Sequence, residues 1–155
     1  MFDLTESPPR IRGFPHKENY FEDEFHLRDW LDSSLRIDEQ GEYWLGEAPG
    51  LGELPRGSIV LFYFKNKIVG EALVEQAPEE IDQEKRERDE VSEEFKKYIL
   101  FVPESIRTYP DRLFISEEEF EEITGKALQH YFEITPEQYL LLMRKLAEKS
   151  LATSR

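Results

Sequence analysis

Aromatic residues beside polar loops are the side chains of this sequence best suited to chemistry, because a flat ligand can stack on an exposed ring. The candidates are Trp30, Tyr43, Trp44, Phe62, Tyr63 and Phe64. Tyr43 and Trp44 precede a loop rich in glycine and proline. Neighbours on a strand point to opposite faces, so we expect at least one of these two rings to be exposed. For Phe62 and Phe64 we expect core packing, with Tyr63 between them as the exposed exception.

A second group of side chains could contact a phosphate or the edge of a ring. It comprises Lys65, Lys67, Arg107, Tyr109, Arg112 and His130. The two lysines flank the tip of an expected hairpin, where the alternative role is protection of a sheet edge. Arg107 to Arg112 share the stretch RTYPDR, an expected loop, and loops commonly carry function. We predict that His130 donates a hydrogen bond to a ligand; the alternative is a structural or surface histidine.

The patterns of catalysis and metal binding are missing. The chain has no cysteine, and its three histidines show no metal-ligand spacing. It contains no nucleophile motif, no phosphate-binding glycine loop and no metalloprotease helix. We therefore expect no catalytic residue, no metal and no cofactor.

The charge of the chain bears on its partners. A net charge of −14 argues against general affinity for phosphate backbones. The acids concentrate in residues 18–42, 79–94 and 117–122. These segments are either solvated faces that keep the protein soluble or a surface that docks a basic protein partner. Neither a long apolar run nor a signal peptide is visible, so we expect a cytoplasmic protein that does not enter a membrane.

The pattern of apolar residues, caps and turns predicts an α+β fold. We expect an extended arm over residues 1–17 that settles onto the fold through Ile11 and Phe14. One domain is expected over residues 18–150, with residues 79–94 as a charged insertion. The expected elements are a helix over 22–34, strands over 43–45, 58–64, 67–75, 98–102 and 105–108, a capped helix from Ser116 to Gly125, a strand over 126–134 and a second capped helix from Thr135.

Three stretches carry a resemblance to a known group. LPRGSIVLFYFKNKIVGEALVE, KYILFVPESIRTYP and TGKALQHYFEITPEQYLLLMRKL resemble the PUA-like superfamily, which includes the ASCH, EVE and YTH-type domains. The resemblance implies a mixed β pseudobarrel with peripheral helices and a capped C-terminal helix. It also implies recognition of RNA or of a modified base in DNA, in an RNA-related or a defence pathway.

Two functions from different classes remain open at this point. The first is a non-catalytic module that takes RNA or a modified nucleobase into an aromatic-lined pocket. The alternative is an acidic protein-interaction factor on the same fold, without nucleic-acid binding. A hydrolase of the ASCH type is a third alternative, implied by the resemblance alone.

Overall fold

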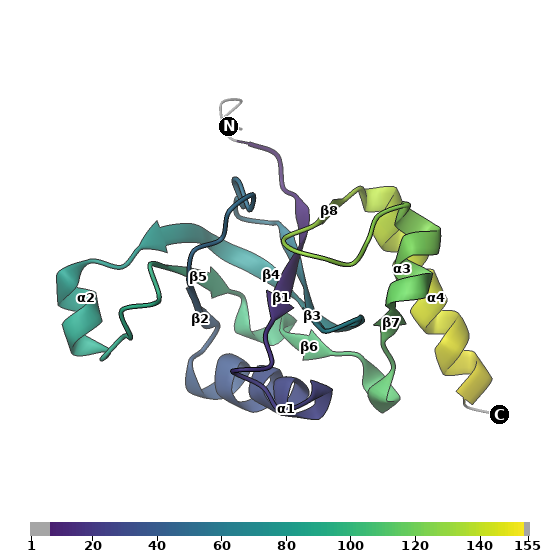
Figure 1. Ribbon diagram of the computed structural model, residues 1–155, viewed down its shortest axis with the longest axis horizontal. Coiled ribbons are helices and arrows are strands. Elements are labelled where there is room, and N and C mark those ends of the chain that lie inside the picture. The colour runs from purple at the N-terminus through teal and green to yellow at the C-terminus, as the bar shows by residue number, and fades with distance from the viewer. Residues whose placement is uncertain (1–6, 154–155) are drawn as a thin grey trace.

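A mixed sheet organises the chain in the computed structural model, which describes residues 7–153 (Figure 1). Its strands are β1 (Ile11–His16), β2 (Glu42–Leu45), β3 (Ile59–Phe64), β4 (Lys67–Glu80), β5 (Lys97–Phe101), β6 (Arg107–Thr108), β7 (Ile115–Ser116) and β8 (Glu133–Ile134). The helices are α1 (Glu24–Asp29), its π-helical continuation η1 (Trp30–Asp38), α2 (Gln83–Arg88), α3 (Glu117–Thr124) and α4 (Pro136–Thr153), with short turns η2 (Pro103–Ser105) and η3 (Pro110–Arg112). The expected α+β class is confirmed.

The sheet is curled but not closed. Its order is β2-β5-β4-β3-β1-β8, with β6 and β7 also pairing with β4, and within residues 7–153 no pairing joins β8 to β2. Four strand spacings of about 4.8 Å would separate β1 from β2 in a flat sheet. The rings of Phe14 on β1 and Tyr43 on β2 are nevertheless 5.6 Å apart. The sheet therefore bends around a shared core, and the expected pseudobarrel is an open one.

The N-terminal segment corrects one expectation. We expected residues 1–17 to form an arm, but Ile11–His16 is a buried strand inside the sheet, parallel to β3 and antiparallel to β8. Phe14 is fully buried there. Ile11 and Phe14 contact the fold as expected, but residues 11–16 are a strand inside the sheet and not an arm outside the domain, while residues 1–6 lie outside the described part of the chain.

The hairpin β3–β4 forms as expected and explains its long apolar runs. Alternate residues of β3 face opposite sides: Val60, Phe62 and Phe64 join one core cluster, while Leu61 and Tyr63 join the other. The strand is thus buried on both faces. At the tip, Lys65 rather than Asn66 takes the left-handed conformation, with φ 54°.

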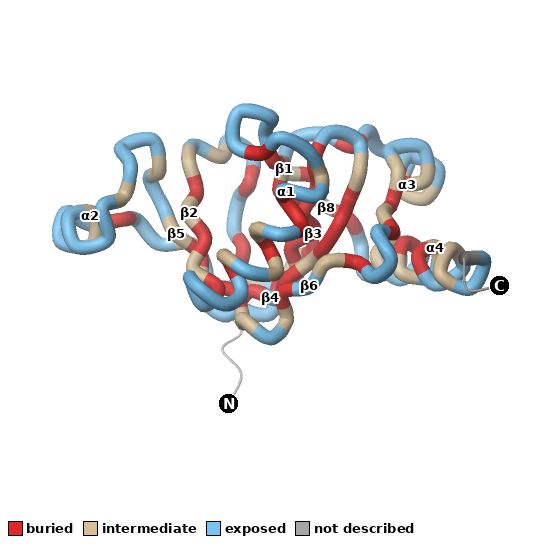
Figure 2. Tube along the Cα trace, turned by 90° about the horizontal axis from the view of Figure 1, so that it is seen from below, coloured by how far each residue is buried: buried red, intermediate tan, exposed pale blue. Residues whose placement is uncertain are grey.

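Helices cover the two faces of the sheet. Leu27, Leu31 and Leu35 of α1 and η1 cover the first cluster, and Phe120, Leu142 and Leu146 of α3 and α4 cover the second. Figure 2 shows that burial follows the central strands and leaves α2 exposed. None of the helices in residues 7–153 has the length and apolar character needed to cross a membrane.

Both predicted C-terminal caps are present, but the strand between them is mostly a loop. Ser116 and Glu119 exchange the two bonds of a capping box, and so do Thr135 and Gln138. Of the strand expected over residues 126–134, only Glu133–Ile134 pairs with the sheet. The rest loops back over β1, where the Phe132 ring packs on Gly13, and a Cβ at Gly13 would lie 2.0 Å from that ring.

Candidate functional site

A cavity of about 520 Å³ opens between the end of β1, α1, η1, β2 and the segment that leads into β5. Aromatic rings from four separate stretches of the chain dominate its wall. The lining residues are Pro15, His16, Lys17, Tyr20, Phe21, His26, Trp30, Tyr43, Trp44, Leu45, Gly46, Glu47, Glu94, Phe95 and Tyr131. The charged residues in this set, Lys17, Glu47 and Glu94, are exposed, so the interior is mainly apolar.

The floor of the cavity is a buried pair, His16 and Tyr43. The His16 Nδ1 is 3.2 Å from the Tyr63 carbonyl, which can only accept, so Nδ1 carries the hydrogen. The Nε2 then accepts from the Tyr43 hydroxyl at 2.8 Å. Burial lowers the pKa of His16 to about 4 and raises the pKa of Tyr43 above its usual value. The floor is therefore neutral at physiological pH, and the Tyr43 oxygen keeps only acceptor capacity for a ligand.

Rings at steep angles to one another form the wall above this floor. Trp30 lies 5.8 Å from Tyr43 at 73° and 5.6 Å from Phe21 at 70°. The edge-to-face arrangement is the favoured one for aromatic pairs. Trp30 stands at the start of η1 and is only partly buried, as is Trp44 across the cavity. Both rings therefore have surface left for a ligand.

Residues of the charged insertion form the lip. The Tyr20 hydroxyl donates to a Glu94 carboxylate oxygen at 2.6 Å, and the Tyr20 ring lies 6.4 Å from that of Phe95. Arg86 of α2 donates to the carbonyls of Ser92 and Phe95, at 2.9 Å each. Residues 79–94 therefore hold one edge of the cavity in place.

The sequence prediction placed Tyr43 and Trp44 in a ligand site, and the structure brings this pair to the cavity together with Trp30. Trp44 also packs on Tyr98, with ring centroids 6.1 Å apart. Tyr63 is a correction, since we expected it to be exposed. Its side chain faces the other core cluster, it is only 4% exposed, and its hydroxyl donates to the His130 carbonyl at 2.6 Å.

The hairpin lysines lie away from the cavity and are engaged in ion pairs. Lys65 is 3.4 Å from Glu18, and Lys67 is 2.7 Å from Glu24. The Lys67 ammonium also stands 4.8 Å from the centre of the Phe114 ring. Neither lysine lines the cavity.

The three candidates of the RTYPDR stretch are dispersed as well. Arg107 pairs with Glu71 at 3.3 Å. Tyr109 is 2% exposed, with its hydroxyl on Glu71 at 3.2 Å, and its burial raises its pKa. Arg112 is exposed and lies 5.0 Å from the Phe25 ring centre. None of them lines the aromatic cavity.

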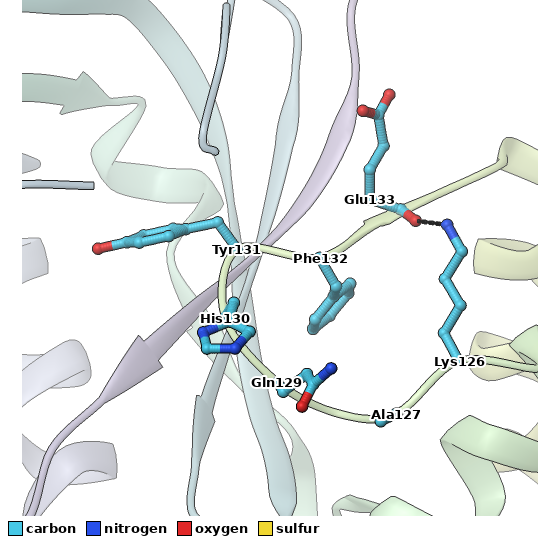
Figure 3. A pocket seen from close by; sticks show the side chains of 7 residues that line it. All are labelled: Lys126, Ala127, Gln129, His130, Tyr131, Phe132 and Glu133. Atoms are coloured by element: carbon cyan, nitrogen blue, oxygen red, sulfur yellow. Dashed lines mark hydrogen bonds between the residues drawn. The ribbon is translucent and has the colours of Figure 1, made fainter. Parts of the chain in front are cut away.

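His130 lies at a separate, shallower hollow of about 360 Å³ (Figure 3). We expected it in a strand, but it occupies the loop before β8 with a left-handed backbone, φ 52°. Lys126 on the far side donates to the Glu133 carbonyl at 2.7 Å. In Figure 3 the Tyr131 ring points away from Lys126, and it lines the aromatic cavity as well. His130 itself does not reach the aromatic cavity.

Most of the cavity residues were not predicted from the sequence. Within residues 7–153, no three histidine or carboxylate side chains gather in a way that could hold a metal ion. His16 was hidden by the expectation of an N-terminal arm, and Tyr20 lay in no expected element. Glu94 and Phe95 were hidden by the charge of their segment. The one usable signal was the density of rings in residues 14–30.

Comparisons with known proteins give little beyond this. No family model matches the chain, and no curated protein matches it. Among solved structures, the crystal structure of ASCH from Zymomonas mobilis is similar over 87% of this chain and 94% of that one, with 11% sequence identity and a TM-score of 0.48.

Proposed function

We propose that this chain is a non-catalytic binding module of PUA-like type that takes a nucleobase, from RNA or in modified form, into the aromatic cavity. The observation that carries the proposal is the cavity itself, about 520 Å³ in volume with Trp30 and Trp44 only partly buried in its wall. A base stacked on such a ring gains roughly 1–3 kcal/mol.

The polar groups of the cavity suit the edge of a base. The Tyr43 hydroxyl donates its hydrogen to His16, so its oxygen is available to accept from an amino or ring N–H group. His26 accepts from the Glu22 backbone N–H at Nδ1, at 3.1 Å, which leaves Nε2–H as a donor. One acceptor and one donor beside a stacking surface are the elements of base recognition.

The intrinsic fluorescence of the protein provides the test. The chain has two tryptophans, and both line the cavity, so a stacked base should quench their emission. Titration with single nucleosides, unmodified and methylated, should give saturable quenching. Trp30→Leu should weaken the affinity about tenfold, since 1.4 kcal/mol corresponds to one factor of ten.

Phe25→Leu is the matched control for Trp30→Leu. Phe25 lies in the same helical segment, is 43% exposed and does not line the cavity. It should leave nucleoside affinity unchanged. Equal loss in both variants, or quenching by no nucleoside, would contradict the proposal.

One observation favours the alternative function, an acidic surface that docks a basic protein. Two bases of the insertion face inward: Lys85 contacts Glu42 at 3.3 Å, and Arg86 binds backbone carbonyls. On the exposed side of this segment, Arg88 is paired with Asp89 at 3.3 Å, which leaves Glu84, Glu87 and Glu90 as an acidic surface. Replacing Glu84, Glu87 and Glu90 with glutamine should abolish capture of a basic partner if this surface serves binding. Deleting residues 79–94 would be ambiguous, because it would also remove the lip of the cavity.

A further inference from the structure

The charges around the aromatic cavity narrow the class of ligand beyond the proposed function. Two carboxylates, Glu47 and Glu94, stand among the lining residues, against one ammonium group, that of Lys17. A cavity with this balance of fixed charge attracts a positive ligand more than a neutral one.

The buried histidine of the cavity, His16, adds no positive charge. It is held neutral by its two hydrogen bonds, to the Tyr63 carbonyl and the Tyr43 hydroxyl. Burial also lowers its pKa to about 4. The exposed His26 accepts at Nδ1 from the Glu22 N–H at the rim.

The rings themselves favour a cation. The faces of tryptophan and tyrosine attract positive charge through their quadrupole, and several rings around one site act together. The protein already uses this interaction at Trp44, which also lines a second hollow together with Lys85: the Lys85 ammonium lies 5.5 Å from the centre of the Trp44 ring and 4.4 Å from that of Tyr98.

The charges around the cavity do not favour a ligand with a phosphate backbone. Three basic side chains that we expected to contact phosphate are paired with glutamates and lie outside the cavity: Lys65, Lys67 and Arg107. The whole chain carries −14. A ligand without phosphates avoids this repulsion.

We infer that the cavity selects a positively charged, N-alkylated nucleobase, as the free base or nucleoside, over the neutral base. The inference rests on the proposed function, because it assumes that a base stacks in this cavity. The cation would lie against the partly exposed ring of Trp30 or Trp44, close to the Glu94 carboxylate of the lip. A neutral base gains the stacking alone, whereas the charged base gains the cation–π and carboxylate interactions in addition.

The test compares two isomers, 1-methyladenosine and N6-methyladenosine, by tryptophan quenching at neutral pH. They are isomers in their neutral forms, but 1-methyladenosine binds a proton and is a cation at neutral pH, whereas N6-methyladenosine stays neutral. The cation should bind about tenfold tighter. Glu94→Gln should remove several-fold of that advantage and leave the neutral isomer unaffected, since glutamine still accepts from Tyr20. Glu93→Gln, at an exposed neighbour outside the cavity, is the matched control.

The outcomes separate the two proposals. Equal or tighter binding of N6-methyladenosine would overturn the selection of a cation and leave the proposed base-binding function standing. If neither nucleoside binds, both proposals fail. Binding of a trimethyllysine peptide in place of either nucleoside would also overturn the inference, and would assign the cavity to a methylated protein.

Discussion

At the scale of the residue, His16 fixes the chemistry of the cavity floor. Its ring donates to the Tyr63 carbonyl and accepts from the Tyr43 hydroxyl, so both nitrogens are used in the neutral form. Protonation would place a second hydrogen on Nε2, opposite a hydroxyl that now donates to it. Burial adds the cost of desolvating the charged ring. The neutral imidazole is therefore part of the folded structure.

This burial makes the stability of the fold depend on pH. The pKa of His16 is lowered from 6.5 to about 4, so the unfolded chain binds a proton that the folded chain does not bind between these values. The contribution of the neutral ring is fully present above pH 6.5 and is lost as the pH falls towards 4. The loss in free energy of unfolding amounts to about 3 kcal/mol at 1.36 kcal/mol per pKa unit.

Urea unfolding at a series of pH values checks this expectation. His16→Gln, which keeps a donor and an acceptor but does not titrate, should flatten the pH dependence between 6.5 and 4. His130→Gln, at an exposed histidine, should leave the dependence as in the unmodified protein. If His16→Gln keeps the full slope, His16 is not the group responsible.

The Tyr43 hydroxyl is expected to matter for stability as well as for a ligand. Tyr43→Phe leaves the buried His16 Nε2 without its donor, which should lower the free energy of unfolding by about 1–3 kcal/mol. Tyr98→Phe removes a hydroxyl from the exposed Glu79 and should cost little. Thermal unfolding of the two variants side by side gives the comparison, and equal costs would contradict the assigned bond.

At the scale of the element, structure that depends on residues close in sequence could be predicted, whereas structure that depends on distant contacts could not. The hairpin β3–β4 and both capping boxes were predicted from runs, turns and caps within a few residues of each other. Strand β1 was missed because it contains Arg12, whose burial depends on distant partners. The Arg12 guanidinium donates to the Gly50 and Tyr131 carbonyls and to Glu133. No local pattern in Ile11–His16 indicates these contacts.

The same limit applies to the residues of the aromatic cavity. Tyr43 and Trp44 could be singled out because they stand beside a loop, but their neighbours Phe21, Phe95 and Tyr131 come from stretches that only the curled sheet brings together. Tyr63 was misjudged because a strand buried on both faces gives no sign of which residue is exposed.

Gly70 marks a close approach between elements that the sequence did indicate. A glycine inside an expected strand indicates a bulge, a corner or a near neighbour, and the register of β3 and β4 shifts beside Gly70. A Cβ at Gly70 would lie 2.5 Å from the Arg107 backbone oxygen of β6. Because β6 would have to move, Gly70→Ala should cost about 1–3 kcal/mol in chemical denaturation.

Gly46→Ala is the control for this change. Its Cβ would lie 3.4 Å from the Glu94 carbonyl oxygen, an ordinary contact, and its backbone is not in the left-handed region. We expect a change within about 0.5 kcal/mol. If both variants change the free energy of unfolding only slightly, β6 can move to accommodate the new Cβ at little cost.

At the scale of the whole molecule, the net negative charge of the protein is compatible with nucleobase binding if the protein recognises the base and not the phosphate backbone. The molecule carries α2 at one end and α3 and α4 at the other, with the sheet between them (Figure 1). The paired lysines and arginines leave no cluster of free basic groups around the cavity among the described lining residues.

This distribution predicts how affinity depends on chain length and salt. An oligonucleotide that contains the preferred base should bind no tighter than the nucleoside alone, and its affinity should rise or stay level as salt screens the repulsion. Fluorescence titrations from low to physiological salt measure both effects. Tighter oligonucleotide binding that weakens steeply with salt would show a basic contact surface instead.

The most direct measurement of the central claim is an NMR titration of the labelled protein with single nucleosides. The two indole N–H signals report on the cavity, because both tryptophans line it. We predict that both indole signals and the amides of Tyr43 to Leu45 shift together and saturate. Unchanged indole signals, or shifts confined to Arg107–Arg112 or to the loop around His130, would contradict a base-binding aromatic cavity.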